Sequence, residues 1–291
     1  MKYPAIDPVL IDFGPVQIRW YGLMYVIAFF MAYVLLRRFG TRAGRDLGSD
    51  EVGDLLGYCV IGVIAGARLG YCLFYNLPYY LGEPLRIFAV WEGGMSFHGG
   101  LTGAMVSGWM FALRRKKAFL MLADLGGLVA PVGLFFGRLG NFINGELYGR
   151  VTTVPWGMVF PGGGGLPRHP SQLYEALLEG PALFLVLALL GRRDLPMGFL
   201  FASFLSGYGL IRFVVEFFRE PDAQLGFILG PLTMGQLLSL LMIALGMLLC
   251  QVARMLHQKR RAAKAEKPRG RTGPRAPKTS ARPASSDSKR L

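Results

Sequence analysis

The chain has 291 residues, of which 53% are hydrophobic and only 17% are charged, against about 25% charged in an average soluble domain. This composition excludes a disordered chain, a collagen and a small disulfide-stabilised domain. It also argues against an ordinary soluble enzyme, because too few charged residues are available to cover its surface. The net charge of +14 is concentrated near the end of the chain, since residues 254–291 carry +11 and residues 1–253 only +3.

Seven apolar segments approach the length of about 20 residues that a membrane-spanning helix needs. In chain order they are 20–36, 55–75, 95–113, 119–136, 171–191, 197–218 and 225–253. Lys and Arg cluster after the first, third, fifth and seventh segments, and short basic loops face the cytoplasm. The sequence therefore predicts an all-α integral membrane protein with seven transmembrane helices, the N-terminus outside and the C-terminus in the cytoplasm.

The basic segment 254–291 is predicted to be a disordered cytoplasmic tail. It mixes 13 Lys and Arg residues with Pro, Ser, Ala and Gly, a composition that cannot bury enough apolar surface to fold. A tail lying near anionic lipid explains this charge better than a nucleic-acid-binding arm, so we expect no nucleic acid partner. We divide the chain into a seven-span domain, residues 1–253, and this tail.

Glycines recur at every fourth position in three of the segments, a spacing that lets helix backbones approach closely in lipid. They are Gly62, Gly66 and Gly70, then Gly99 and Gly103, then Gly133 and Gly137. We expect helix contacts at all of them.

The cysteines and histidines do not predict a metal site. Cys59, Cys72 and Cys250 form no CxxC pair and are expected to be small buried hydrophobic residues. The three histidines lie far apart in the sequence. We expect neither a metal nor a disulfide framework.

Ionisable residues inside apolar segments are candidates for function, because each costs at least about 2.5 kcal/mol to insert. They are Arg68, His98, Asp124, Arg138, Glu175, Glu179, Arg212 and Glu216. Tyr208, Arg212, Glu216 and Arg219 are spaced to share one helix face, where Arg212 and Glu216 can pair. This face is either a structural ion pair or a polar stripe lining a cavity.

The segment GRLGNFINGELYGR, residues 137–150, concentrates guanidinium, amide and carboxylate groups where a membrane helix is expected to end. Arg138 and Asn141 lie one helical turn apart, and Glu146 follows. Such donors at the membrane surface suit an anionic head group, although a simple connecting loop is the alternative.

His98 stands between glycine pairs in GGMSFHGG at the outer end of the third segment. It is either a satisfied core residue or an acid–base group, since histidine titrates near neutral pH. His169, before Pro170 at an expected helix start, is predicted to be structural. Tyr21 belongs to the interfacial aromatic residues, and its hydroxyl can reach a lipid head group.

Five blocks carry a family resemblance: RWYGLMY (19–25), WEGGMSFHGG (91–100), GRLGNFINGELYGR (137–150), PRHPSQLYEALLEG (167–180) and YGLIRFVVEFFREPDAQ (208–224). Together they resemble the bacterial phosphatidylglycerol–prolipoprotein diacylglyceryl transferases from about residue 8 to about residue 250. The resemblance implies transfer of the diacylglyceryl group of phosphatidylglycerol to the lipobox cysteine of a prolipoprotein in the bacterial inner membrane. The products are a thioether and glycerol phosphate, and the resemblance implies no cofactor.

The resemblance also implies site residues. The family's essential arginines fall on Arg138 and Arg212, and its essential histidine on His98. Its supporting and substrate-binding positions fall on Tyr21, Asn141, Glu146, Gly149, Tyr208 and Glu216. The chain matches the family at every one of these positions.

These residue types suit the implied chemistry. Two arginines can hold a departing phosphate ester by bidentate hydrogen bonds, and a histidine can accept the proton of the attacking thiol. Alternatively, arginine charge alone stabilises the thiolate and His98 positions the substrate. A transporter would instead distribute ionisable residues along whole spans and usually shows repeats, and a scaffold gives no reason for GRLGNFINGE.

Overall fold

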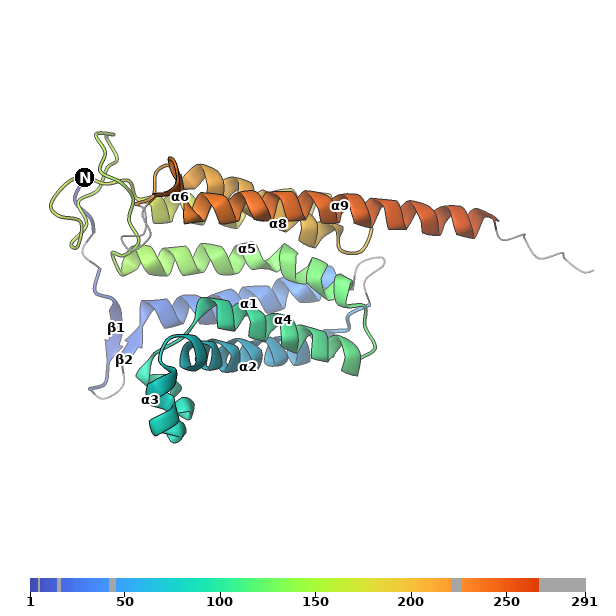
Figure 1. Cartoon of the computed structure of the whole chain (residues 1–291), viewed down its shortest axis with the longest axis horizontal. Helices are drawn as coiled ribbons and strands as arrows, with labels where there is room; N and C mark the ends of the chain where they lie inside the picture. Colours follow the sequence, from blue (N-terminus) through green and yellow to red (C-terminus); the bar gives the residue numbers. More distant parts are fainter. Residues whose placement is uncertain (5, 15–16, 42–45, 221–226, 267–291) are drawn as a thin grey trace, which may run out of the picture. The chain divides into compact units, whose positions relative to one another are not determined.

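The computed structural model describes residues 1–4, 6–14, 17–41, 46–220 and 227–266 (Figure 1). Long helices dominate: α1 (Trp20–Gly40), α2 (Ser49–Phe74), α4 (Phe97–Arg114), α5 (Phe119–Ile143), α8 (Phe199–Val215) and α9 (Met234–Glu266). A further helical segment is continuous from α6 (Ser171–Leu177) through the π-helical η3 (Leu178–Ala182) to α7 (Leu183–Leu190). The short helices α3 (Leu77–Gly82), η1 (Pro84–Phe88) and η2 (Val90–Glu92) connect α2 to α4.

Four short strands form two antiparallel hairpins at the same end of the helices. β1 (Val9–Asp12) pairs with β2 (Gln17–Arg19), and β3 (Phe227–Leu229) pairs with β4 (Leu232–Thr233). The second hairpin corrects the predicted start of the last helix from residue 225 to Met234. Gly230 adopts a φ of +58° at the turn between β3 and β4, a conformation that glycine allows, and this tight turn is what delays the helix.

The structure is that of a helical membrane protein. Among the described residues, five helices are long and apolar enough to cross a membrane: Trp20–Gly40, Ser49–Phe74, Phe119–Ile143, Ser171–Leu190 and Met234–Lys259. Helix α8 is apolar but has only 17 residues, and α4 does not reach the same hydropathy because it contains His98 and Arg114. The predicted number of seven spans and the predicted orientation of the termini therefore stay predictions.

Helix α5 occupies the middle of the unit Met1–Arg254, the first of two compact units in the chain. It packs against α1, α6, η3 and α8, while α2 packs closely on α4 (Figure 1). The main apolar core, which includes Val52, Phe111, Leu125 and Leu187, lies where α1 and α4 end and α2 and α5 begin. The opposite end of the helices holds the ionisable residues discussed below.

Two helix ends differ from the sequence prediction. Helix α5 continues regularly to Ile143 instead of ending near residue 136, so Arg138 and Asn141 are on the helix itself. Helix α9 continues to Glu266 through the start of the predicted tail, because Ala, Lys, Arg and Gln residues have a high intrinsic propensity for helix. The rest of the predicted tail, residues 267–291, lies outside the described residues.

The predicted glycine contacts are confirmed between α2 and α4. A Cβ built on Gly66 would lie 2.4 Å from the Gly99 carbonyl oxygen, and one on Gly103 would lie 1.9 Å from the Gly62 carbonyl oxygen. Only glycine allows the two backbones to approach this closely. By contrast, a Cβ on Gly133 or Gly137 would meet no atom of the described structure within 4 Å, so the contact predicted there is wrong.

We expect Gly103→Ala to destabilise the protein strongly, because its methyl group would collide with rigid backbone and force α2 and α4 apart. Overpacking of this kind costs about 1–3 kcal/mol or more. Gly108→Ala on the same helix is the matched control, since a Cβ there meets nothing within 4 Å. Thermal unfolding in detergent measures both variants, and equal melting temperatures would contradict the close contact.

Two of the ionisable residues in apolar segments have structural roles. The buried Arg68 guanidinium donates to the carbonyl oxygens of Arg86 (2.6 Å), Ile87 (2.9 Å) and Gly93, and so holds the α3–η2 segment on α2. Asp124 accepts hydrogen bonds from the backbone N–H groups of Gly198 (2.7 Å) and Phe201 (2.9 Å). It thereby satisfies the first amides of α8, as a capping residue would.

Candidate active site

Six ionisable side chains form a largely buried network where α5, α6, η3 and the end of α8 meet. Its members are Arg138, Glu175, Glu179, Arg212, Glu216 and Arg219. The Glu175 and Glu179 side chains are 1% and 0% exposed, and the three arginine side chains are 13–18% exposed. Three positive and three negative charges balance, which is what allows so many to lie out of water together.

Glu175 is the common partner of the three arginines. Its Oε2 lies 2.7 Å from Arg138 Nε, and its Oε1 lies 3.4 Å from Arg219 Nη1 and 3.7 Å from Arg212 Nη1. The guanidinium groups of Arg138 and Arg212, which come from different helices, thus meet at one carboxylate. The sequence predicted the importance of both arginines, and the structure brings them together.

The π-helical turn η3 places Glu179 beside this point. Gly180 has a φ of −88° and a ψ of −109°, and Pro181 follows it, so the regular helix is interrupted directly after Glu179. A Cβ on Gly180 would lie 2.7 Å from Phe135 Cβ, so this turn packs tightly on α5. Glu179 Oε2 consequently reaches Arg138 Nε at 3.4 Å.

The predicted ion pair between Arg212 and Glu216 is confirmed, with Arg212 Nη2 2.8 Å from Glu216 Oε2. Glu216 is fixed from the other side, because its Oε1 accepts a 2.9 Å hydrogen bond from Thr233 Oγ1. Gly235 completes this contact, since a Cβ there would lie 2.7 Å from the Glu216 carboxylate. The start of α9 therefore supports the arginine at the end of α8.

Asn141, Glu146 and Gly149 shape the turn that follows α5. Asn141 Nδ2 donates to Glu146 Oε1 at 2.9 Å, and the buried Asn141 faces inward while Glu146 is exposed. Gly149 N–H donates to the His169 carbonyl oxygen at 2.8 Å, and a Cβ on Gly149 would lie 2.3 Å from the Phe218 carbonyl oxygen. Gly149 thus permits three chain segments to meet directly beside Arg219.

The neighbouring Arg150 and His169 strengthen this meeting point. Arg150 Nε donates to the Arg219 carbonyl oxygen at 2.8 Å. The His169 ring contacts Tyr174 Oη through Nδ1 at 3.1 Å and packs edge-on against Phe218. Partial burial lowers the pKa of His169 below the usual value, which favours the neutral ring at pH 7. These contacts agree with the structural role predicted for His169.

Two predicted tyrosines lie close to the network. The Tyr21 ring packs on Gly140, where an added Cβ would lie 2.6 Å from Tyr21 Cδ2, and its hydroxyl is 3.4 Å from that of Tyr25. Tyr208 lies on α8 one turn before Arg212, near enough to interact electrostatically with Arg138 and Arg212. The Tyr208 hydroxyl therefore belongs to the surroundings of the two arginines.

The structure does not join His98 to the arginines. His98 is the second residue of α4, its side chain is exposed, and its ring contacts the edge of Phe97. Among the described residues, no hydrogen bond or ion pair links the ring to the network. It is therefore not a satisfied core residue, and it lies exposed at the start of α4.

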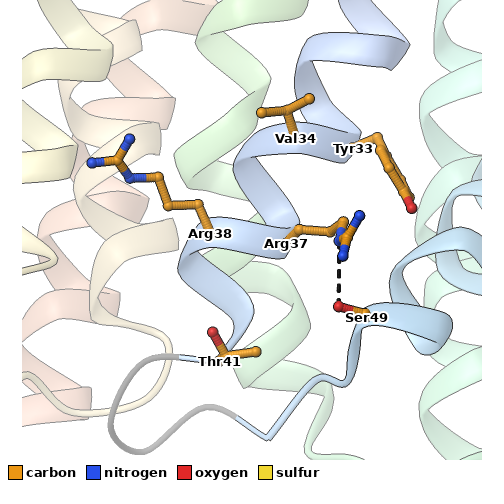
Figure 2. Close-up of a pocket in the computed structure, with 6 residues that line it drawn as sticks. All are labelled: Tyr33, Val34, Arg37, Arg38, Thr41 and Ser49. Carbon is orange, nitrogen blue, oxygen red and sulfur yellow. Dashed lines mark hydrogen bonds between the residues drawn. The ribbon is translucent and has the colours of Figure 1, made fainter.

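A pocket of about 450 Å³ lies far from this network, between the end of α1 and the start of α2 (Figure 2). Its lining includes Arg37, whose Nε donates to Ser49 Oγ at 3.3 Å, together with Arg38 and Thr41. None of the residues predicted from the sequence lines it. The pocket belongs to the basic end of the helices.

The cysteines differ from expectation in burial. Cys72 is buried, but Cys59 and Cys250 are only partly buried, because a helix surrounded by lipid need not bury its apolar residues in protein. All three are free thiols. Within the described part of the chain, no group of His, Cys, Asp and Glu side chains is arranged to hold a metal ion.

Glu175, Glu179 and Arg219 belong to this network but were not among the site residues predicted from the sequence. Glu175 and Glu179 stood out as costly residues four apart in an apolar segment, and Arg219 as a member of the polar face with Arg212. The spacing of Glu175 and Glu179, and the shared helix face of Arg212 and Arg219, were the signals that each pair acts together. Their pairing with an arginine of another helix needed the three-dimensional structure.

Comparison with known proteins now identifies the family. The model of the prolipoprotein diacylglyceryl transferase family matches residues 8–252. A phosphatidylglycerol–prolipoprotein diacylglyceryl transferase of Geobacter sulfurreducens is 61% identical over 247 residues, covering 85% of this chain and 95% of the relative. Enzymes of the same name from Nitratidesulfovibrio vulgaris and Vibrio parahaemolyticus are 52% and 51% identical, covering 85% and 86% of this chain and 94% and 91% of those relatives. The chain therefore belongs to the prolipoprotein diacylglyceryl transferase family.

Proposed function

We propose that this protein transfers the diacylglyceryl group of phosphatidylglycerol to the lipobox cysteine of prolipoproteins. The cysteine sulfur forms a bond to the glyceryl carbon, and the bond from that carbon to the phosphate oxygen breaks. The electron pair leaves with the phosphate, which departs as glycerol phosphate, and the thiol proton passes to a base. The observation that carries this proposal is the meeting of Arg138 and Arg212 at one anionic group, Glu175.

Arg138 and Arg212 are the proposed phosphate-binding residues. Negative charge is present on the phosphate before and after the carbon–oxygen bond breaks, and guanidinium groups bind it by charge-assisted hydrogen bonds. Their positions are fixed by carboxylates, Arg138 by Glu175 and Glu179 and Arg212 by Glu216. Donors held in place in a site with little water stabilise the leaving group more than mobile donors in water.

The other predicted residues have supporting roles. Tyr21 and Tyr208 offer hydroxyl groups beside the arginines, and Asn141 with Glu146 holds the turn after α5. Gly149 keeps that turn against His169 and Phe218, and Glu216 orients Arg212. His98 accepts the thiol proton, or else it positions the peptide while arginine charge stabilises the thiolate. This reaction requires no cofactor.

The location of the network supports a lipid-modifying enzyme more than a transporter. The ionisable side chains gather at one end of the helices, whereas the apolar core with Leu125 and Leu187 fills the other end. A transporter needs polar groups along its whole path. We place the protein in the bacterial inner membrane with seven spans and with the network near the periplasmic surface, where residues 1–253 form the catalytic domain.

Purified protein with phosphatidylglycerol and a lipobox peptide tests the function. We expect the peptide to gain the mass of a diacylglyceryl group, and a peptide with serine in place of the cysteine to gain none. Label in the acyl chains should appear in the peptide, whereas label in the glycerol head group should appear in released glycerol phosphate. Head-group label in the peptide would contradict the proposed bond cleavage.

A further inference from the structure

Glu175 differs from the other two carboxylates of the network in the number of arginines with which it forms ion pairs. Among the described residues, Glu179 pairs with one arginine, Arg138, and Glu216 pairs with one arginine, Arg212. Glu175 contacts Arg138 of α5, Arg212 of α8 and Arg219 of the segment that follows α8. The Glu175 carboxylate therefore lies at the only point among the described residues where three guanidinium groups converge.

The two carboxylate oxygens of Glu175 differ in their hydrogen bonds, since Oε1 accepts one from Arg219 Nη1 at 3.4 Å and Oε2 accepts none from a described residue. Although Oε2 of Glu175 lies 2.7 Å from Arg138 Nε, it makes no hydrogen bond with a described residue, and neither does the buried Arg212 Nη1. Charged groups that are buried without aligned hydrogen bonds recover little of their lost hydration. A phosphate, with more acceptor oxygens in a tetrahedral arrangement, can align with donors that a flat carboxylate leaves unused.

Unlike Glu216, the Glu175 and Glu179 side chains make hydrogen bonds or ion pairs only with arginines among the described residues. Glu216 is held by Thr233 Oγ1 at 2.9 Å and sits on the same helix as its arginine. Glu175 belongs to α6, a helix of seven residues that leads into the π-helical turn. Replacement of the Glu175 contacts by a phosphate would leave the Arg212–Glu216 pair in place, because Thr233 also holds Glu216.

We propose that Glu175 is a positioning residue that gathers the guanidinium groups of Arg138, Arg212 and Arg219 and competes with the lipid phosphate for Arg138 and Arg212. This inference rests on the proposed function, because it assigns the phosphate of phosphatidylglycerol to the same arginines. Binding of the lipid exchanges carboxylate contacts for phosphate contacts, and release of glycerol phosphate reverses the exchange. The competition keeps the phosphate from binding so tightly that the product cannot leave.

Glu175→Gln tests the competition, because glutamine has nearly the same shape and no charge. In zwitterionic phosphatidylcholine vesicles we expect a lower melting temperature than for the wild-type protein, since the arginines lose their common partner. Phosphatidylglycerol should then raise the melting temperature of the variant more than that of the wild type. The KM for phosphatidylglycerol should fall at least about threefold, and kcat should fall with it because product leaves more slowly.

Two variants serve as controls. Glu83→Gln removes an exposed carboxylate that lies 3.0 Å from Arg86 Nε, outside the network, and should leave both KM and melting temperature unchanged. Glu175→Asp keeps the charge and should restore most of the stability in phosphatidylcholine. If Glu175→Gln does not fold, the double variant Glu175→Gln/Arg219→Gln keeps the charges balanced and should show the same lower KM.

A KM for phosphatidylglycerol that is unchanged or raised in the folded variant would overturn the competition and leave Glu175 a purely structural partner. The wild-type protein, assayed in the same experiment, separates this result from failure of the proposed function. Transfer by the wild type with an unchanged KM in the variant refutes the inference alone. Absence of transfer by the wild type refutes the function on which it rests.

Discussion

Arg138→Ala and Arg212→Ala are each expected to lower the rate of diacylglyceryl transfer by at least about 100-fold. Each variant removes one of the two guanidinium groups that pair with Glu175. These are the groups proposed to bind the lipid phosphate. Loss of one preorganised donor to a developing negative charge costs about 100- to 1,000-fold in other enzymes. The initial rate of thioether formation on a lipobox peptide measures the effect at saturating phosphatidylglycerol.

Loss of stability must be separated from loss of catalysis in these variants. Arg138→Ala leaves Glu175 and Glu179 without their nearest cation, and an uncompensated buried charge costs about 3–5 kcal/mol. The double variant Arg138→Gln/Glu179→Gln keeps the charges balanced, so it should fold and remain inactive. Arg86→Ala, which removes an exposed arginine that pairs with Glu83 and Glu92, should keep wild-type activity. Substantial activity in either single arginine variant would contradict the phosphate role.

Hydropathy was enough to predict a helical membrane protein, but it located helix ends poorly. Long apolar segments show that a helix crosses the membrane, since every backbone group must be satisfied there. They do not show where the helix stops, because residues such as Arg138 and Asn141 are costly in lipid yet lie within α5 when neighbouring helices supply partners. The π-helical turn at Gly180 likewise depends on packing against Phe135, which no local pattern reveals.

The cost of burying charge singled out the ionisable residues of the apolar segments but did not indicate their roles. Arg68 and Asp124 are as expensive in an apolar segment as Arg138, yet they satisfy backbone groups of nearby segments. The partners of Arg68 and Asp124 are backbone carbonyl and amide groups. Because nearly every residue has these groups, the sequence does not show which of them will be the partners. The pairing of Arg212 with Glu216 was predictable because both lie on one helix. The pairing of Arg138 with Glu175 was not predictable, because the two residues lie on different helices.

His98 remains the residue whose role depends most on the substrate. The helix that carries it is fixed by Ser96, whose N–H donates to the Ala67 carbonyl oxygen at 2.9 Å and whose Oγ accepts from Gly99 N–H at 3.2 Å. Its ring is exposed beside Phe97 and has no contact with the arginine network in the described structure. A proton acceptor that acts on a peptide thiol needs this accessibility, and so does a residue that only positions the peptide.

His98→Gln should slow transfer by about 100-fold or more if the imidazole accepts the thiol proton, since general-base catalysis contributes about 100- to 10,000-fold. Stabilisation by phosphatidylglycerol should be unchanged, because His98 does not contact Arg138 or Arg212. The pH profile then distinguishes its two possible roles. Without a base, the rate should rise about tenfold per pH unit up to the thiol pKa of about 8.5, because the thiolate fraction rises with pH below that value.

The wild-type rate should instead depend much less steeply on pH below the thiol pKa, because the imidazole takes the proton during attack and no prior ionisation of the thiol is required. If arginine charge alone stabilises the thiolate, the variant and the wild type should have profiles of the same shape, with the variant only lower throughout. Parallel profiles would therefore reduce His98 to a positioning residue and leave the arginines as the sole source of the reactive sulfur. His169→Gln is the matched control, because its partly buried ring packs on Tyr174 and Phe218 and has the structural role described above. Any rate that it loses should leave the shape of the profile unchanged.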